Sequence, residues 1–369
     1  MENKVKNLSK EEEKNISSQS TVPIKNIGHT SFHARNMEEM LHFYCDILGM
    51  ERLFSSSYSE IYNSLKRRVG ETPTEKEKKL LSLMFSKGDE KWVENLKLAD
   101  RQYLELFYDD GQEKEVFGDR NDYYGYFKLN FEVGDIEKIK KSLVENNIVL
   151  VRDIHKTVDG SFEITVHDPD GNEVQFTEYS PNALHKLGIE AVLNHAKDTL
   201  SLVRYTTQVA YHVCATEKMK QFYCDGLGLK TVHTITYGEL LESLQQNTMT
   251  SKNSHLIDKI KAYGNRPWVD YLEVAPHQYI EFFYDDNEEK KERRDLSQFY
   301  GYQHLCLEVD NIQDAWKAVI ANGLTPDTQI NLGADRSWQF WLVDPDGNRL
   351  ELMQYTADSK QLFHKVLGE

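Results

Sequence analysis

The chain contains the same segment twice, and this internal repeat limits its fold more than any other feature of the sequence. The run FYCDILGM at 43–50 returns as FYCDGLGL at 222–229, which is 179 residues later. Further matches, each 176 residues apart, are the pairs YLELFYDD and YIEFFYDD, YYGY and FYGY, and DPDGN and DPDGN. A nearly constant spacing across separate matches indicates a tandem duplication of a unit of about 176 residues.

A weaker repeat divides each half into two units with the same order of elements. In the first unit, residues 27–34 alternate apolar and polar side chains as a half-buried strand does, and Asn36 precedes a helix that Gly49 ends. In the second unit, the DPDG turn at 168–171 predicts a hairpin. Each unit is thus a strand, a helix and three further strands. The four predicted copies lie at about 25–110, 123–180, 203–286 and 299–357.

Other segments fall outside this pattern. Two inserts, at 56–97 and 235–267, are charged and helix-prone. They occur at matching positions in the two halves, which indicates that the insert was present before the duplication. Residues 1–24 are polar and lack periodicity, which predicts a disordered leader. The linker 181–202 and the C-terminal tail 358–369 are predicted to be helical.

Composition excludes several classes of protein. The 369 residues include 44 basic and 60 acidic side chains, and a net charge of −16 argues against binding to nucleic acid or to an anionic membrane. No apolar run approaches the roughly 20 residues that span a bilayer, and no secretory signal begins the chain. The cysteines lack CxxC spacing, so we expect buried reduced thiols in a cytoplasmic protein. They are Cys45, Cys214, Cys224 and Cys306.

The repeated unit opens with HTSFHARNMEEMLHFYCDILGM and closes with DPDGN before an apolar–Glu–apolar strand. This pattern resembles the vicinal oxygen chelate superfamily, which includes glyoxalase I, extradiol dioxygenases, methylmalonyl-CoA epimerase and bleomycin-resistance proteins. The resemblance covers nearly all of 25–357. It implies an α+β fold of four βαβββ modules that form two paired glyoxalase-like domains, at 25–180 and 203–357, with U-shaped open barrels.

The resemblance also implies a divalent metal inside a barrel, held by one residue from the first strand of each unit and one from its last strand. Strand side chains recur with period two, so residues on four strands can point into one cavity. In the order of the four units, the residues at these positions are His29 and Glu105, Lys128 and Gln175, Gln208 and Glu281, and His304 and Glu351. The ammonium group of Lys128 has no free lone pair, so we expect the second unit to have lost metal binding.

Two pairings of the units are compatible with these positions. Pairing of adjacent units would build a site from Gln208, Glu281, His304 and Glu351. Pairing of the outer units would build it from His29, Glu105, His304 and Glu351. Both sets are similar to those of glyoxalase I branches, and imidazole with carboxylate suits Zn, Ni, Fe or Mn. Because short connections usually leave neighbouring elements together, we favour adjacent pairing, with a degenerate site in the first domain.

The resemblance implies a metal-dependent lyase or isomerase of glyoxalase type, acting on a small substrate with vicinal oxygens. In such chemistry the metal stabilises an enediolate, and a carboxylate moves a proton between neighbouring carbons. Glu351 is the predicted base, with Glu281 or Glu105 as its counterpart. A low-molecular-weight thiol is a candidate co-substrate, and a homodimer is a candidate assembly. Two alternatives stay open: an extradiol-type ring-cleaving dioxygenase with a two-His-one-carboxylate iron site, and a metal-free small-molecule-binding protein.

Several other residues are predicted to have only structural roles. The histidines outside the ligand positions are His33, His185, His212 and His364. The DPDG turns lack the regular acidic spacing of a calcium loop. The aromatic run of Trp338, Phe340 and Trp341 is predicted to lie in the core or at a dimer interface.

Overall fold

The structure is a computed structural model, and it describes residues 20–70, 72–111, 114–116, 122–180, 183, 201–246, 254–284 and 298–363. Most of the predicted leader and nearly all of the predicted helical linker lie outside these residues. Of the predicted C-terminal helix, the described part is α11 (Lys360–Phe363).

The predicted order of elements in each unit is confirmed in the first half of the chain. The first module contains β1 (Ile24–His33), α2 (Met37–Leu41), the π-helix η1 (His42–Ile47), β2 (Glu51–Ser57), β3 (Lys91–Ala99) and β4 (Gln102–Phe107). The second module contains β5 (Gly125–Val133), α5 (Ile136–Glu145), β6 (Leu150–Lys156), β7 (Phe162–His167) and β8 (Glu173–Glu178).

The second half repeats this order. The third module contains β9 (Val203–His212), α7 (Thr216–Lys220), the π-helix η3 (Gln221–Gly226), β10 (Lys230–Thr236), β11 (Pro267–Ala275) and β12 (Gln278–Phe283). The fourth module contains β13 (Gly301–Val309), α10 (Ile312–Ala321), β14 (Asn331–Leu332), β15 (Trp338–Val343) and β16 (Arg349–Gln354).

Local sequence signals explain where the first helix begins and ends. The side chain of Asn36 accepts a hydrogen bond from the backbone N–H of Glu39, as an N-cap residue does. The segment predicted as one helix is α-helical only to Leu41 and continues as η1, whose wider turns bury Tyr44 with its apolar neighbours. Gly49 ends it with a φ of 80°, a conformation that glycine adopts without steric cost.

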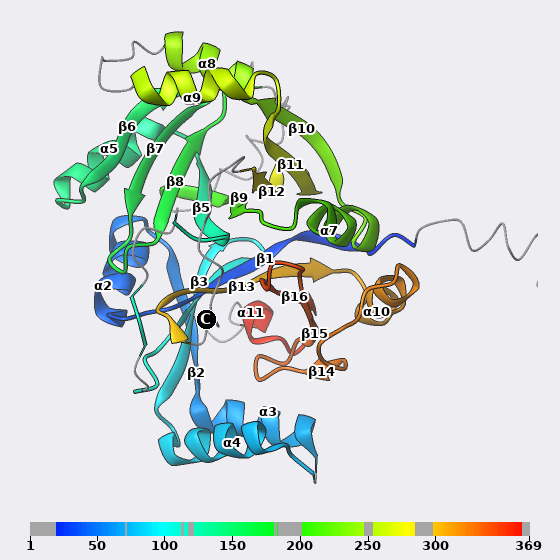
Figure 1. Ribbon diagram of the computed structural model, residues 1–369. Coiled ribbons are helices and arrows are strands. Elements are labelled where there is room, and N and C mark those ends of the chain that lie inside the picture. Colours follow the sequence, from blue (N-terminus) through cyan, green and yellow to red (C-terminus); the bar gives the residue numbers. More distant parts are fainter. Residues whose placement is uncertain are drawn as a thin grey trace, which may run out of the picture.

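The four modules form two eight-stranded sheets, and each sheet joins one module from the first half of the chain with one from the second half (Figure 1). The first sheet, from modules one and four, has the order β14-β15-β16-β13-β1-β4-β3-β2. The second, from modules two and three, has the order β10-β11-β12-β9-β5-β8-β7-β6. At the centre of each sheet the first strands of two modules are antiparallel. The prediction that adjacent modules pair within 25–180 and within 203–357 is therefore wrong, and the outer pairing is correct.

The two modules within each half of the chain are in contact through their helices and turns. The hydroxyl of Tyr44 in η1 donates a hydrogen bond to Asp168 in the DPDGN turn of module two, at 3.0 Å. Tyr223 makes the same 3.0 Å contact with Asp344 of module four. These contacts hold the two modules of each half together, although their strands belong to different sheets. In a single module the first strand is an edge strand, and its unpaired side offers only backbone hydrogen bonds. The first strand of any other module can satisfy them, so the length of the connection alone does not decide which module pairs with it.

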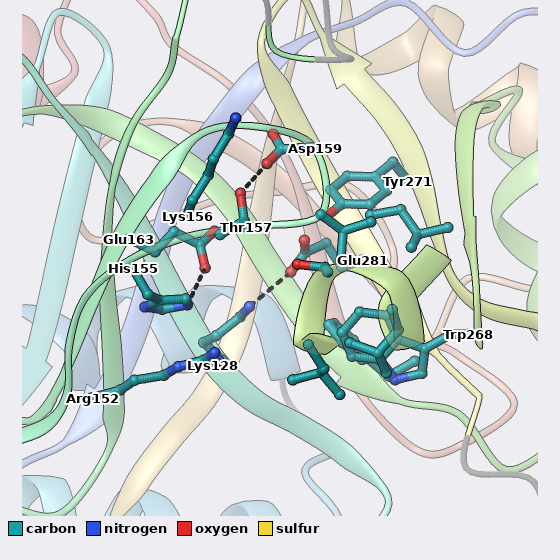
Figure 2. Close-up of a pocket in the computed structure, with 16 residues that line it drawn as sticks. Lys128, Arg152, His155, Lys156, Thr157, Asp159, Glu163, Trp268, Tyr271 and Glu281 are labelled. Carbon is teal, nitrogen blue, oxygen red and sulfur yellow. Dashed lines mark hydrogen bonds and ion pairs between the residues drawn. The ribbon is translucent and has the colours of Figure 1, made fainter. Parts of the chain in front are cut away.

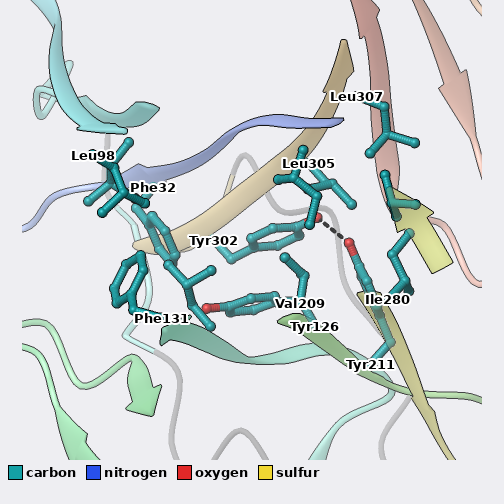
Figure 3. Packing of buried hydrophobic residues seen from close by; sticks show 14 of the residues in the cluster. Phe32, Leu98, Tyr126, Phe131, Val209, Tyr211, Ile280, Tyr302, Leu305 and Leu307 are labelled. Carbon is teal, nitrogen blue, oxygen red and sulfur yellow. Dashed lines mark hydrogen bonds between the residues drawn. The ribbon is translucent and has the colours of Figure 1, made fainter. Parts of the chain in front are cut away.

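One apolar core fills the space between the two sheets (Figure 3). Phe32 of β1 and Leu305 of β13 point into it from the first sheet. Tyr126 of β5 stacks on Tyr302 of β13 with 4.0 Å between ring centroids, and the hydroxyls of Tyr302 and Tyr211 are 2.7 Å apart. Because alternate strand residues point to opposite faces, the side chains between these core residues lie on the outer face of each sheet.

The two inserts form helices, as predicted, and lie at opposite ends of the molecule (Figure 1). The first insert contains α3 (Tyr58–Val69) and α4 (Glu75–Lys87), each opened by a capping box. The second contains α8 (Tyr237–Gln246) and α9 (Ser254–Tyr263).

All four cysteines lie in the described ranges and are free thiols. The expectation that they are buried holds for Cys306 but is wrong for Cys214, which is exposed where β9 leads into α7, and for the half-buried Cys45 and Cys224. Among the described helices, none is long and apolar enough to cross a membrane.

Candidate metal centre

Two histidines and two glutamates meet on the outer face of the first sheet. His29 lies on β1, Glu105 on β4, His304 on β13 and Glu351 on β16. These strands are neighbours at the centre of the sheet, in the order β16-β13-β1-β4. The leucines on either side of each glutamate are buried in the core, so the period-two alternation turns the carboxylates to the opposite face.

The donor atoms of these side chains are close together. His29 Nε2 is 3.1 Å from His304 Nε2 and 3.1 Å from a carboxylate oxygen of Glu351. His304 Nε2 is 3.5 Å from the same oxygen. A carboxylate oxygen of Glu105 is 3.4 Å from His29 Nε2 and 3.9 Å from His304 Nε2. The Glu105 side chain is 13% exposed, whereas the Glu351 side chain is 4% exposed.

These separations fit a shared cation. Nitrogen and oxygen ligands that bind one ion at about 2.0–2.2 Å are themselves roughly 3.0–3.5 Å apart. Imidazole with carboxylate is a donor set that first-row divalent metals accept. Among the residues that the structure describes, two groups have the spacing of a metal site. One is His29, Glu105 and His304, and the other is His29, Glu351 and the buried Cys306. The residues present therefore fit a divalent metal ion.

The four side chains also perturb one another electrostatically. Burial opposes the charged form of His29, but the carboxylates of Glu105 and Glu351 outweigh it and raise its pKa to about 9. Burial lowers the pKa of His304 to about 4. Burial opposes ionisation of Glu351, yet hydrogen bonds from the two histidines lower its pKa to about 2. Burial raises the pKa of Glu105 to about 7. The two glutamates therefore differ: Glu351 is held as a carboxylate, and Glu105 accepts a proton near neutral pH.

Three neighbours of the centre were not predicted from the sequence. The Ser31 hydroxyl is 2.6 Å from Nδ1 of His304 and orients the imidazole ring. Phe107 lies beside His304, with 6.2 Å between ring centroids. The ring of Trp341 is 4.7 Å from that of His304. Period-two spacing from His29 could have identified Ser31, and the same spacing from Glu105 could have identified Phe107.

A core position, as predicted for the aromatic run, is confirmed for Phe340. Phe340 is fully buried in the core, but Trp338 is 40% exposed. Trp341 is directly opposite Glu351 on the neighbouring strand, which is why its ring contacts the site.

The ligand set predicted from adjacent pairing is not brought together. Gln208 of β9 and Glu281 of β12 belong to the second sheet, whereas His304 and Glu351 belong to the first. The predictions of Gln208 and Glu281 as metal ligands, and of Glu281 as a counterpart base, are therefore wrong. The error follows directly from the wrong choice of module pairing.

At the equivalent place in the second sheet, an ammonium group stands beside the carboxylate. Lys128 Nζ is 3.2 Å from a carboxylate oxygen of Glu281. The amide of Gln208 is occupied at both ends, because Asn130 Nδ2 donates to its oxygen at 2.5 Å and its nitrogen donates to the Tyr179 hydroxyl at 2.9 Å. The positions that correspond to His304 and Glu105 thus hold an ion pair in the second sheet.

The fold and the site together define a class of protein: paired βαβββ modules that carry a His/Glu donor set at the centre of a shared sheet. A sequence model of the Glyoxalase/Bleomycin resistance protein/Dioxygenase superfamily matches residues 26–176 and 206–352. The chain belongs to this superfamily. Comparison with curated protein sequences gives no match.

Solved structures with the same fold are similar over most of the chain. Glyoxalase I from Zea mays is 14% identical, with a TM-score of 0.52 over 89% of this chain and 92% of that one. A mutant of the maize enzyme has a TM-score of 0.54, with 14% identity, over 89% of this chain and 93% of its own. A protein from Bacillus subtilis named "putative dioxygenase" is 10% identical, with a TM-score of 0.57 over 94% of this chain and 91% of that one.

Proposed function

We propose that the centre binds a divalent metal ion and that the protein is a metal-dependent lyase or isomerase of glyoxalase I type. The substrate class is a small molecule with vicinal oxygens, formed with a low-molecular-weight thiol. The convergence of two imidazoles and two carboxylates from four central strands carries this proposal. A bound Zn, Ni, Fe or Mn ion would supply Lewis acidity toward the substrate oxygens.

The geometry divides the four side chains into ligands and a base. Glu351 is within 3.5 Å of both His29 and His304, so we assign these three residues as the firmest ligands. Glu105 lies farther from the histidines and is the more exposed glutamate, and no hydrogen bond engages it within the part of the chain that the structure describes. We therefore assign Glu105, rather than Glu351, to take the proton from one carbon and return it to the next.

The test begins with the metal content of the purified protein. Elemental analysis is expected to find one of the four metals, and stripping it should abolish thiolester formation from methylglyoxal and a thiol. At least one of the four metals should restore the activity. Absence of activity with every metal would contradict the proposed reaction, and a protein that binds no metal would favour the metal-free alternative.

The two sheets offer a matched pair of variants for the base. Glu105→Gln is expected to lower kcat by about 100-fold or more, because general base catalysis contributes on that scale. Glu281→Gln changes the equivalent position of the second sheet and should leave kcat unchanged. Equal losses in both variants would argue against Glu105 as the base.

One observation favours a second candidate, an extradiol-type dioxygenase. The atoms of His29, His304 and Glu351 lie within 3.1–3.5 Å of one another, which fits a two-His-one-carboxylate iron site with Glu105 outside it. Iron-dependent oxygen uptake with a catechol, without thiolester formation, would support this reaction over the lyase.

A further inference from the structure

The second sheet carries a cavity on its outer face, around the pair of Lys128 and Glu281 (Figure 2). It encloses about 570 Å³ of empty space, part of which is open to solvent. Strands β5, β6, β7, β10, β11 and β12 line it, and α8 of the second insert covers one side with Leu240 and Leu244.

A metal ion does not fit this cavity, because an ammonium group already stands at the ligand position. Lys128 is 176 residues before His304 and occupies the same place in its module. Its side chain is 9% exposed, and that of its partner Glu281 is 2% exposed. Burial opposes the charged form of Lys128, but Glu281 and Glu163 outweigh it and raise its pKa, so the ammonium is retained.

The two walls of the cavity differ in chemistry. Lys128 and Arg152 extend into it from one wall (Figure 2). Arg152 is exposed, and its guanidinium has no hydrogen bond or ion pair within the described ranges. The opposite wall is apolar and aromatic, and the residues that form it are Ile235, Leu240, Leu244, Trp268, Tyr271 and Phe283.

The acidic groups of the cavity are engaged by protein donors. Glu163 accepts hydrogen bonds from Gln175 at 2.6 Å and from Thr177 at 3.2 Å. Asp159 accepts hydrogen bonds from Thr157 and Ser161 in its own turn. Glu281 is paired with the Lys128 ammonium group. The guanidinium of Arg152 is therefore a charged group on this wall that is open to a ligand.

We propose that this cavity is a metal-independent binding site for a small monocarboxylic acid with an aromatic or branched apolar body. The guanidinium of Arg152 pairs with the carboxylate through its planar fork of N–H donors, and Lys128 adds a second positive charge. The body of the ligand packs on Trp268 and Phe283 beneath α8. A dianion such as phosphate is disfavoured, because the carboxylate of Glu281 lies in the same cavity.

The experiment uses the full chain, treated with a chelator so that the metal centre of the first sheet is empty. The probes are benzoate, phenylacetate and 3-methylbutanoate, each compared with the alcohol of the same body, and inorganic phosphate. We expect saturable binding of at least one carboxylate, detected by ligand NMR and by tryptophan fluorescence, and no saturable binding of the alcohols or of phosphate. Failure of all three carboxylates to bind overturns the proposal.

Three variants locate the binding. Arg152→Gln is expected to weaken binding of the carboxylate by about tenfold, the loss of one charge-assisted contact. Arg67→Gln, a change at an exposed arginine on α3, should leave binding unchanged, and so should His29→Ala in the metal centre. Parent-like binding by Arg152→Gln, or loss of binding in His29→Ala, would overturn the assignment to this cavity. Metal content is measured separately, so failure here is distinct from failure of the metal centre.

Discussion

Ser31 contacts the candidate metal centre without belonging to its donor set. Its hydroxyl, 2.6 Å from Nδ1 of His304, fixes the ring so that Nε2 faces the other donors. Loss of such a partner typically weakens metal affinity by about 10–100-fold. We expect Ser31→Ala to weaken metal affinity in this range, measured by competition titration with a chelator. Ser142→Ala, a change at a serine that bonds the backbone of η1, is the control and should bind metal like the parent.

Glu163, which lines the cavity of the second sheet, makes the free energy of unfolding depend on pH in a predictable way. Burial raises its pKa from 4.5 to about 7. Between these values the folded protein holds a proton on Glu163 that the unfolded chain releases, so the free energy of unfolding falls as pH rises through this window. Glu163→Gln cannot titrate and keeps an oxygen acceptor. Relative to the parent, this variant should therefore gain stability between about pH 5 and about pH 8.

Urea denaturation at about pH 5 and at about pH 8 measures this gain in the free energy of unfolding. Glu51→Gln, at an exposed position of β2, serves as the control and should follow the parent at both. A stability difference between Glu163→Gln and the parent that is the same at both pH values would show that Glu163 does not titrate in the folded protein as proposed.

At the scale of elements, the two sheets hold equivalent strands with different side chains. The positions of His29, His304 and Glu351 in the first sheet correspond to Gln208, Lys128 and Gln175 in the second. Glu105 corresponds to Glu281, and this glutamate is kept in both sheets. The strands therefore supply the same scaffold twice, and the side chains decide whether it presents metal donors.

This correspondence predicts that a second metal centre can be built. The triple variant Gln208→His, Lys128→His and Gln175→Glu gives the second sheet the donor set of the first. We expect it to bind one more metal ion per chain than the parent, measured by elemental analysis after dialysis. The double variant that keeps Lys128 should not bind the additional ion, because the ammonium group stays beside Glu281. Equal metal content in the triple and double variants would contradict this account.

At the scale of the molecule, each sheet is shared between the two halves of the sequence. His29 and Glu105 come from the first half, and His304 and Glu351 come from the second. We expect fragments 1–183 and 201–369, produced together, to co-purify and to bind metal. Produced separately, each fragment exposes the central strand edges that normally pair and lacks half of the donor set, so neither should bind metal.

The fragments also provide a direct test of the module pairing. If adjacent modules paired, fragment 201–369 alone would contain a complete sheet and a complete site. Metal bound by this fragment in isolation would therefore contradict the shared-sheet arrangement. Size-exclusion chromatography with metal analysis of each peak makes the measurement.

The modules and their internal order could be predicted because their signals are local. The alternation around His29, the cap at Asn36, Gly49 and the DPDGN turns act within a few residues of chain. The apolar neighbours of Glu105 and Glu351 likewise predicted on which face of the strand each glutamate lies. The role of Trp341 could not be predicted in this way, because its contact with His304 depends on packing between different strands.

The amino-acid sequence by itself determined four βαβββ modules, the strand positions of the donor side chains, and the replacement of a ligand by Lys128. Only the tertiary structure decided which modules share a sheet, and therefore that His29 and Glu105, rather than Gln208 and Glu281, meet His304 and Glu351. The physical reason is that edge strands pair through backbone groups that are the same in every module. The two modules of each half instead meet through helix and turn contacts around one core, while their strands pair with the other half.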